Sequence, residues 1–155
     1  MRYSLIGLLA GLGIVLLFTV FLIGQYNGLI RMRRRMVIEA LALDFALRQH
    51  LHKLKKSCAD NAGTAVQTEL LRIESLSHRG AANPISNQGI ALLLEAKMII
   101  DQMDQLLGTP SCPEVDRRAE ACLFLVKEYN ECLLLPLPSL MAQVLGFRSV
   151  RMVVG

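Results

Sequence analysis

Residues 4–23 form one unbroken apolar run near the start of the chain. Between Arg2 and Arg31 the sequence contains no Asp, Glu, Lys or Arg. Residues 4–23 alone make a stretch of 20, and a helix of that length is about 30 Å long, which matches the hydrocarbon thickness of a bilayer. The pattern therefore predicts an N-terminal transmembrane helix.

A secretory signal peptide is the main alternative for this run. Signal peptides have an apolar region of about 7–15 residues, followed by a small-residue cleavage site. The run here is longer, and neither an Ala-x-Ala-like site nor a lipobox cysteine follows it. We therefore expect a retained anchor at residues 1–24, a helical domain at 25–147 and a tail at 148–155.

From Gln25 onward the pattern changes to that of an amphipathic helix. Apolar residues recur every three or four positions, which is typical of a helix packed in a bundle. The stripe consists of Leu29, Met32, Met36, Ala40, Leu43, Leu47, Leu51 and Leu54. Because no Pro interrupts it, and Gly28 is the last Gly before Gly63, the anchor is expected to run almost continuously into this helix.

The same periodicity predicts further helices at about 64–77, 86–107 and 111–135, and a short last one within LMAQVL. Gly80 and the pair Asn83-Pro84 suit a loop, Gly108 suits a helix end, and Ser111-x-x-Glu114 has the pattern of a capping box. Since no window alternates as a strand does, the fold class is all-α. The sequence predicts an N-terminal transmembrane helix followed by an antiparallel four-helix bundle.

The distribution of basic residues predicts how the chain is oriented in the membrane. The net charge is +4, but residues 31–56 carry eight basic against two acidic side chains, whereas 60–155 carry eight basic and eleven acidic. Four arginines follow the span, while Arg2 and the amino group precede it. The Lys/Arg bias thus favours an N-terminus outside and a bundle in the cytoplasm. Nucleic acid is not an expected partner, because the basic charge is local and aromatic residues are only 5% of the chain.

Gly7 and Gly11 stand four residues apart within the span. This small-xxx-small spacing lets membrane helices approach closely, so a helix–helix contact through the two glycines, and with it a homo-oligomer, is one reading. The other reading is that glycine is simply common in membrane helices.

Two separated motifs resemble the LemA family. The first is YNGLIRMRRRMVIEALALDFALR at residues 26–48, and the second is YNECLLLPLPSLMAQVLGF at residues 129–147. The positions in register with the family are Tyr26, Asn27, Leu29, Arg31, Arg35, Asp44, Leu47, Tyr129, Asn130, Leu140, Ala142, Gly146 and Phe147. The family's arginine pair and its Leu-Ile-Pro-Asn-Leu stretch are missing, and the middle is shorter. The chain looks like a divergent or shortened member.

The resemblance implies a single-pass protein of the bacterial inner (cytoplasmic) membrane with an antiparallel helical bundle, no cofactor and no established catalytic activity. Some relatives belong to specialised membrane compartments, including magnetosomes. The expected function is that of a scaffold or adaptor. The expected partners are the lipid bilayer and other membrane or membrane-associated proteins.

Asp44 is the most unusual single position, because it borders Leu43 and Leu47 in an apolar stretch. An isolated buried carboxylate is very unfavourable, so a buried Asp44 needs a partner. The expected partner is one of Arg118, Tyr129 and Asn130. Acid–base catalysis is the alternative, but no second carboxylate or nucleophile stands at a defined spacing from it.

Two alternative functions use the remaining polar residues. A metal-dependent membrane enzyme would take its ligands from Asp44, His50, His52, His78 and Cys58, although two His residues two positions apart diverge by about 200° on a helix. A lipid-organising protein would use the basic stretch 31–56 on anionic headgroups. Free thiols are expected at Cys58, Cys112, Cys122 and Cys132, with a zinc site or a Cys58–Cys112 disulfide as the alternatives. Without a nucleophile elbow or a phosphate-binding Gly-rich loop, we expect no enzyme.

Overall fold

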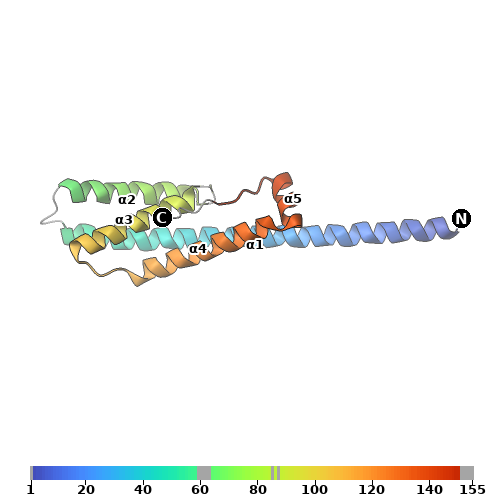
Figure 1. The fold of residues 1–155 in the computed structure, drawn as a ribbon, viewed down its shortest axis with the longest axis horizontal. Coiled ribbons are helices and arrows are strands. Elements are labelled where there is room, and N and C mark those ends of the chain that lie inside the picture. The colour runs from blue at the N-terminus through green and yellow to red at the C-terminus, as the bar shows by residue number, and fades with distance from the viewer. Residues whose placement is uncertain (1, 59–63, 85, 87, 151–155) are drawn as a thin grey trace.

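The computed structural model describes residues 2–58, 64–84, 86 and 88–150. These ranges contain five helices and no strand, which confirms the all-α class (Figure 1). The helices are α1 (Arg2–Cys58), α2 (Thr64–Ala82), α3 (Gly89–Leu107), α4 (Pro113–Leu134) and α5 (Pro136–Leu145).

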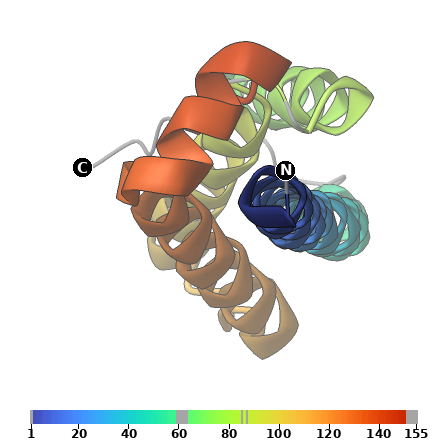
Figure 2. The same ribbon diagram turned by 90° about the vertical axis from the view of Figure 1, so that its right-hand side faces the viewer.

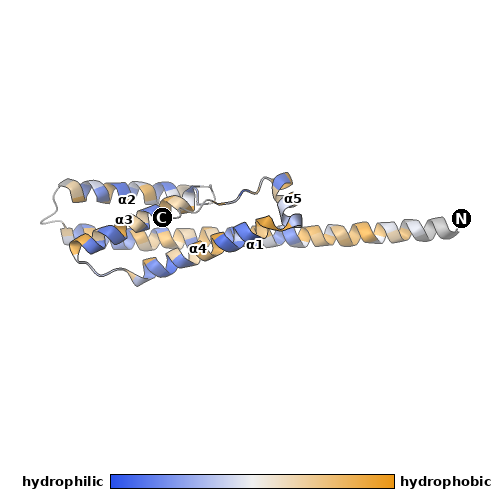
Figure 3. Ribbon diagram, viewed as in Figure 1, coloured by the Kyte–Doolittle hydropathy of each residue, from blue (hydrophilic) through white to orange (hydrophobic). Residues whose placement is uncertain are grey.

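The longest helix, α1, confirms the predicted continuity between the apolar run and the amphipathic stripe. It has 57 residues without a break, which corresponds to about 85 Å. Its N-terminal part projects from the rest of the molecule, and Figure 3 shows this part as mostly hydrophobic. Within the described residues α1 is the one helix that is long and apolar enough to cross a membrane.

The core of the bundle forms along one side of the distal part of α1. Nearly all of the predicted stripe is buried there, and Leu43 and Leu47 have no exposed surface. It packs against apolar residues of α2, α3 and α4, among them Ile73, Leu93 and Val126. Each such side chain contributes about 1.5–3 kcal/mol when it leaves water. The molecule is thus a helical bundle with a projecting helix, while the antiparallel four-helix arrangement stays a prediction.

One side of α1 is free of the other helices that the structure describes. Viewed along α1, the remaining described helices gather around part of its circumference and leave the opposite side open (Figure 2). This asymmetry follows from the single apolar stripe, because only that face buries apolar surface in the bundle.

The prediction of a loop at residues 78–84 is wrong for residues 78–82. Helix α2 continues to Ala82, so Gly80 lies inside a helix. Gly80 is buried where α2 meets α3, and a Cβ atom there would lie 2.8 Å from the Gly89 carbonyl oxygen and 2.8 Å from Leu93 Cγ. The missing side chain permits a close helix contact and does not end the helix.

The N-terminus of α4 differs from the predicted capping box. Its N-cap is Cys112, with no side-chain cap hydrogen bond, and Pro113 occupies the first turn. Proline suits this position because its ring presets the helical φ angle. The helix therefore starts one residue later than a Ser111 cap requires, and Glu114 accepts a hydrogen bond from Arg118 Nε at 2.8 Å.

The helix end predicted at Gly108 is confirmed, and α5 also ends at a glycine. Gly108 and Gly146 have φ angles of +63° and +71°, in the left-handed region that glycine adopts without strain. Helix α4 ends just before Pro136, as predicted, but α5 starts at that proline, four residues before the predicted segment LMAQVL.

Candidate functional site: a groove beside the apolar segment

A groove opens between α1 and the turn that follows α5. Its cavity volume is about 570 Å³, within the usual range for small-ligand sites. We call it the junction groove, because it lies just past the apolar run of α1. Its lining residues are Tyr26, Ile30, Arg33, Arg34, Val37, Ile38, Leu145 and Phe147.

The turn at Gly146 brings Phe147 to α1. The Phe147 N–H donates to the Ala142 carbonyl at 2.9 Å, which closes α5 and directs the aromatic side chain toward the projecting helix. The Phe147 ring meets Tyr26 edge-on, with 6.1 Å between centroids, and the Arg33 guanidinium carbon lies 5.6 Å from its centre. Both contacts are favourable arrangements for an aromatic ring.

The chain after Phe147 is held by Asn130 on α4. The Asn130 side-chain amide donates to the Val150 carbonyl at 2.8 Å, and its oxygen accepts the Val150 N–H at 3.0 Å. The neighbouring Tyr129 is buried, and this burial raises the pKa of its phenol. The chain that follows the last helix is thereby tied to α4.

The structure thus brings together the ends of the two motifs that resemble the LemA family. Tyr26 and Phe147 touch, and Gly146 and Asn130 position the segment that carries Phe147. Five motif residues are buried, namely Leu29, Asp44, Leu47, Tyr129 and Ala142, whereas Asn27, Arg31 and Arg35 are exposed and do not line the groove. In the span, no described atom lies within 4 Å of a Cβ built on Gly7 or Gly11, so their self-association stays a prediction.

The groove carries positive charge that no described carboxylate neutralises. Arg33 and Arg34 form no ion pair with a described residue, and the nearby acid Glu39 is held by Arg118 at 2.9 Å. Among the described side chains, Arg33 Nε is the one buried nitrogen or oxygen without a hydrogen-bond partner. Such a donor is unfavourable in a protein interior, so it marks a place where an acceptor is missing.

Asp44 is buried, but its partners differ from the predicted ones. Its carboxylate accepts a hydrogen bond from Ser77 on α2 and pairs with Arg48, one turn further along α1. The reason is that the Asp44 side of α1 faces α2. The residues predicted from the sequence as partners, Arg118, Tyr129 and Asn130, make their contacts elsewhere.

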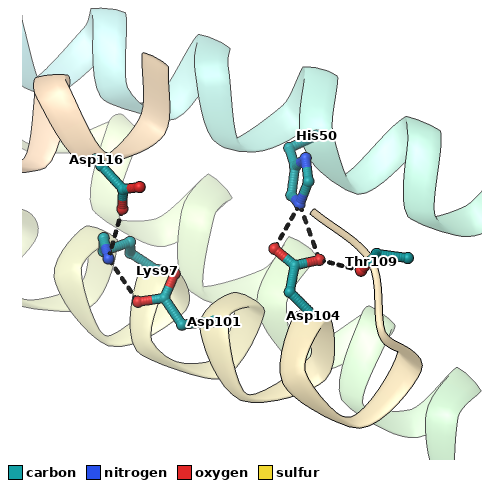
Figure 4. Close-up of polar contacts among 6 residues, drawn as sticks. All are labelled: His50, Lys97, Asp101, Asp104, Thr109 and Asp116. Atoms are coloured by element: carbon teal, nitrogen blue, oxygen red, sulfur yellow. Dashed lines mark hydrogen bonds and ion pairs between the residues drawn. The ribbon is translucent and has the colours of Figure 1, made fainter. Parts of the chain in front are cut away.

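A second buried polar cluster links α1 to α3 and was missed from the sequence (Figure 4). His50 Nε2 lies 2.9 Å from the Asp104 carboxylate, which also accepts a hydrogen bond from the Thr109 hydroxyl at 2.5 Å. His50 continues the three-and-four spacing of Leu43, Leu47 and Leu54. A polar residue at a buried position of this spacing needs a polar partner, and this signal could have indicated the cluster.

Hydroxyl groups satisfy the carboxylates of both clusters. The Thr109 hydroxyl donates a hydrogen bond to Asp104, and the Ser77 hydroxyl donates one to Asp44. Beside them, Lys97 bridges Asp101 and Asp116 across α3 and α4. In the described part of the chain, no three His, Cys, Asp or Glu side chains are grouped so as to hold a metal ion.

All four cysteines are free thiols, and Cys122 provides a test of the core. It is 1% exposed, and burial raises its pKa from 9.0 to about 12. At pH 8 the reactive thiolate is therefore about 1,000-fold rarer than in an unburied thiol. We expect iodoacetamide to modify the partly buried Cys132 of the folded protein faster than the fully buried Cys122, as measured by mass spectrometry. Equal labelling of both thiols would contradict this burial.

Comparison of the chain with protein-family models, with curated proteins and with solved structures gives no significant match. The LemA resemblance therefore remains a prediction from two motifs. Any function has to rest on the geometry of the residues described above.

Proposed function

We propose that the chain is a non-enzymatic adaptor of the bacterial inner membrane. The apolar part of α1 crosses the bilayer once, with the N-terminus outside. The distal part of α1 forms a LemA-like antiparallel four-helix bundle in the cytoplasm with α2, α3 and α4. The bundle binds other proteins at the membrane surface.

An uncovered apolar face on α1 is the observation that carries this proposal. Ile38, Leu41 and Phe45 are 63%, 47% and 63% exposed, although they lie well beyond the apolar run. Their spacing of three and four residues places them on one face, which we call the outer stripe. Large apolar side chains grouped in this way outside the membrane segment are typical of a protein-binding surface.

The partner that fits the outer stripe best is an amphipathic helix with acidic flanks. A helix packs along another helix through side chains spaced three and four residues apart, as in the outer stripe. Basic residues stand beside both ends of the stripe, Arg34 at one and Arg48, with a half-exposed side chain, at the other. Acidic side chains on the partner would complement these charges and fix its register.

The buried polar clusters support the non-enzymatic part of the proposal. Each joins α1 to another helix, Asp44 to α2 and His50 to α3, and so acts as a fixed link within the bundle. A rigid bundle suits a surface that must be presented in one shape to a partner.

The test uses full-length protein purified with its partners from detergent-solubilised membranes. We expect a protein that cross-links to the outer stripe through an acidic amphipathic helix. Its recovery should fall at least tenfold for the double variant Ile38→Ser, Phe45→Ser. Phe124→Ser on α4 is the matched control, because Phe124 is 61% exposed but lies outside the stripe.

Two results would count against the adaptor. One is a strictly monomeric protein with no enriched partner. The other is a partner whose recovery is the same in the stripe variant, the Phe124→Ser control and the unmodified protein. Cross-links joining the stripes of two copies would replace the adaptor with self-association.

A further inference from the structure

We infer that the junction groove holds one acidic phospholipid from the surrounding bilayer. Its phosphate lies against Arg33 and Arg34, and an acyl chain passes Tyr26 toward the hydrocarbon. This inference rests on the proposed anchoring of α1 in a membrane, but it does not depend on the outer stripe having a partner.

The groove lies at the right height for a lipid. With residue 23 at the end of the hydrocarbon, Tyr26 stands about 5 Å and Arg33 about 15 Å further along the helix. Headgroups occupy roughly the first 5–8 Å outside the hydrocarbon, a level where tyrosine side chains are common. Arginine side chains extend toward the headgroups on long stems, so a phosphate raised to the outer edge of this layer reaches them.

The cationic side of the groove suits a phosphate. Arg33 Nε is buried without a hydrogen-bond acceptor among the described residues, and Arg34 has no described acidic partner. A guanidinium binds phosphate oxygens through two parallel hydrogen bonds, which is why arginine is preferred at such sites. Because Glu39 is already paired with Arg118, the carboxylate nearest along α1 does not compete for these donors.

The apolar walls distinguish a lipid from a free anion. Most lining residues are apolar or aromatic, and the Phe147 ring extends the wall opposite α1. An inorganic phosphate would leave this surface in water, whereas an acyl chain covers it. The order along α1 also agrees with an amphiphile, since Tyr26 and Ile30 lie nearer the apolar run and the arginines lie further out.

The experiment is native mass spectrometry of the full-length protein released from nanodiscs of phosphatidylcholine with 30% phosphatidylglycerol. We expect one phosphatidylglycerol retained per chain in preference to phosphatidylcholine. Retention should fall about tenfold or more in the double variant Arg33→Gln, Arg34→Gln. The matched control is Arg31→Gln, Arg35→Gln, which removes the same charge from the same run outside the groove and should retain the lipid.

Several outcomes would overturn the inference. Equal losses in both double variants would mean that only the general charge of the basic run attracts lipid. Displacement of the lipid signal by inorganic phosphate would identify a free anion as the ligand. An unmodified protein without preference for phosphatidylglycerol would exclude the site whatever the variants do, so the result does not depend on their folding. A stripe partner recovered beside a negative lipid result would leave the adaptor standing.

Discussion

Replacing Asp104 by Ala is expected to lower the free energy of unfolding by about 3 kcal/mol or more. The Asp104 side chain is almost fully buried and is the hydrogen-bond partner of both His50 and Thr109. Without the carboxylate, the buried imidazole loses its partner and cannot regain water. The measurement is denaturant unfolding of the full-length protein in micelles, followed by alkylation of Cys122, which becomes reactive only when the bundle opens.

The double variant His50→Leu, Asp104→Leu separates this cause from simple loss of packing. When both partners of a buried polar pair become apolar, neither is left unsatisfied, and the change can be nearly neutral. We therefore expect the double variant to be more stable than Asp104→Ala. If instead Asp104→Ala lowers stability by less than about 1 kcal/mol, the His50–Asp104 contact does not hold α1 to α3.

The parts of the fold that were predicted from the sequence depend on local periodicity. The stripe from Leu29 to Leu54 is visible in the chain, and burial of that stripe decides which side of α1 packs. The helix ends that were predicted wrongly depend on contacts between helices. Gly80 reads as a helix breaker until α3 is placed against it, and only then does its missing side chain explain a close approach.

In the candidate site, too, the sequence points to individual residues but not to the contacts between them. Tyr26 and Phe147 stand out as motif residues, but they are 121 positions apart, and only the fold shows that their rings touch. The four arginines of RMRRR look alike in the sequence. Which two line the groove depends on where the turn at Gly146 returns to α1, so Arg33 and Arg34 were not singled out.

The partners of the buried polar groups escaped prediction for a related reason. His50 and Asp104 are 54 positions apart, and neither belongs to a motif. For Asp44 the need for a partner was clear from burial, yet its identity required knowing that α2 faces it. Burial on a helix can be predicted from spacing, whereas pairing between helices needs their relative positions.

Two positions of α1 that are two residues apart allow a core residue to be compared with a residue of the proposed binding surface. Leu47→Ala is expected to lower the free energy of unfolding by about 2–5 kcal/mol, because it leaves a cavity in a fully buried site. Phe45→Ala, two residues earlier, should change stability by no more than about 0.5 kcal/mol, because Phe45 is 63% exposed. Unfolding of the full-length protein, read by Cys122 alkylation, measures both.

The same pair tests whether the outer stripe exists for binding. If it does, Phe45→Ala should weaken recovery of the partner helix while the bundle stays as stable as the unmodified protein. Leu47→Ala should leave recovery unchanged wherever the bundle remains folded. A Phe45→Ala variant as unstable as Leu47→Ala would place Phe45 in a core, because an exposed side chain has no cavity to leave behind. The uncovered face of α1, and with it the adaptor, would then lose its basis.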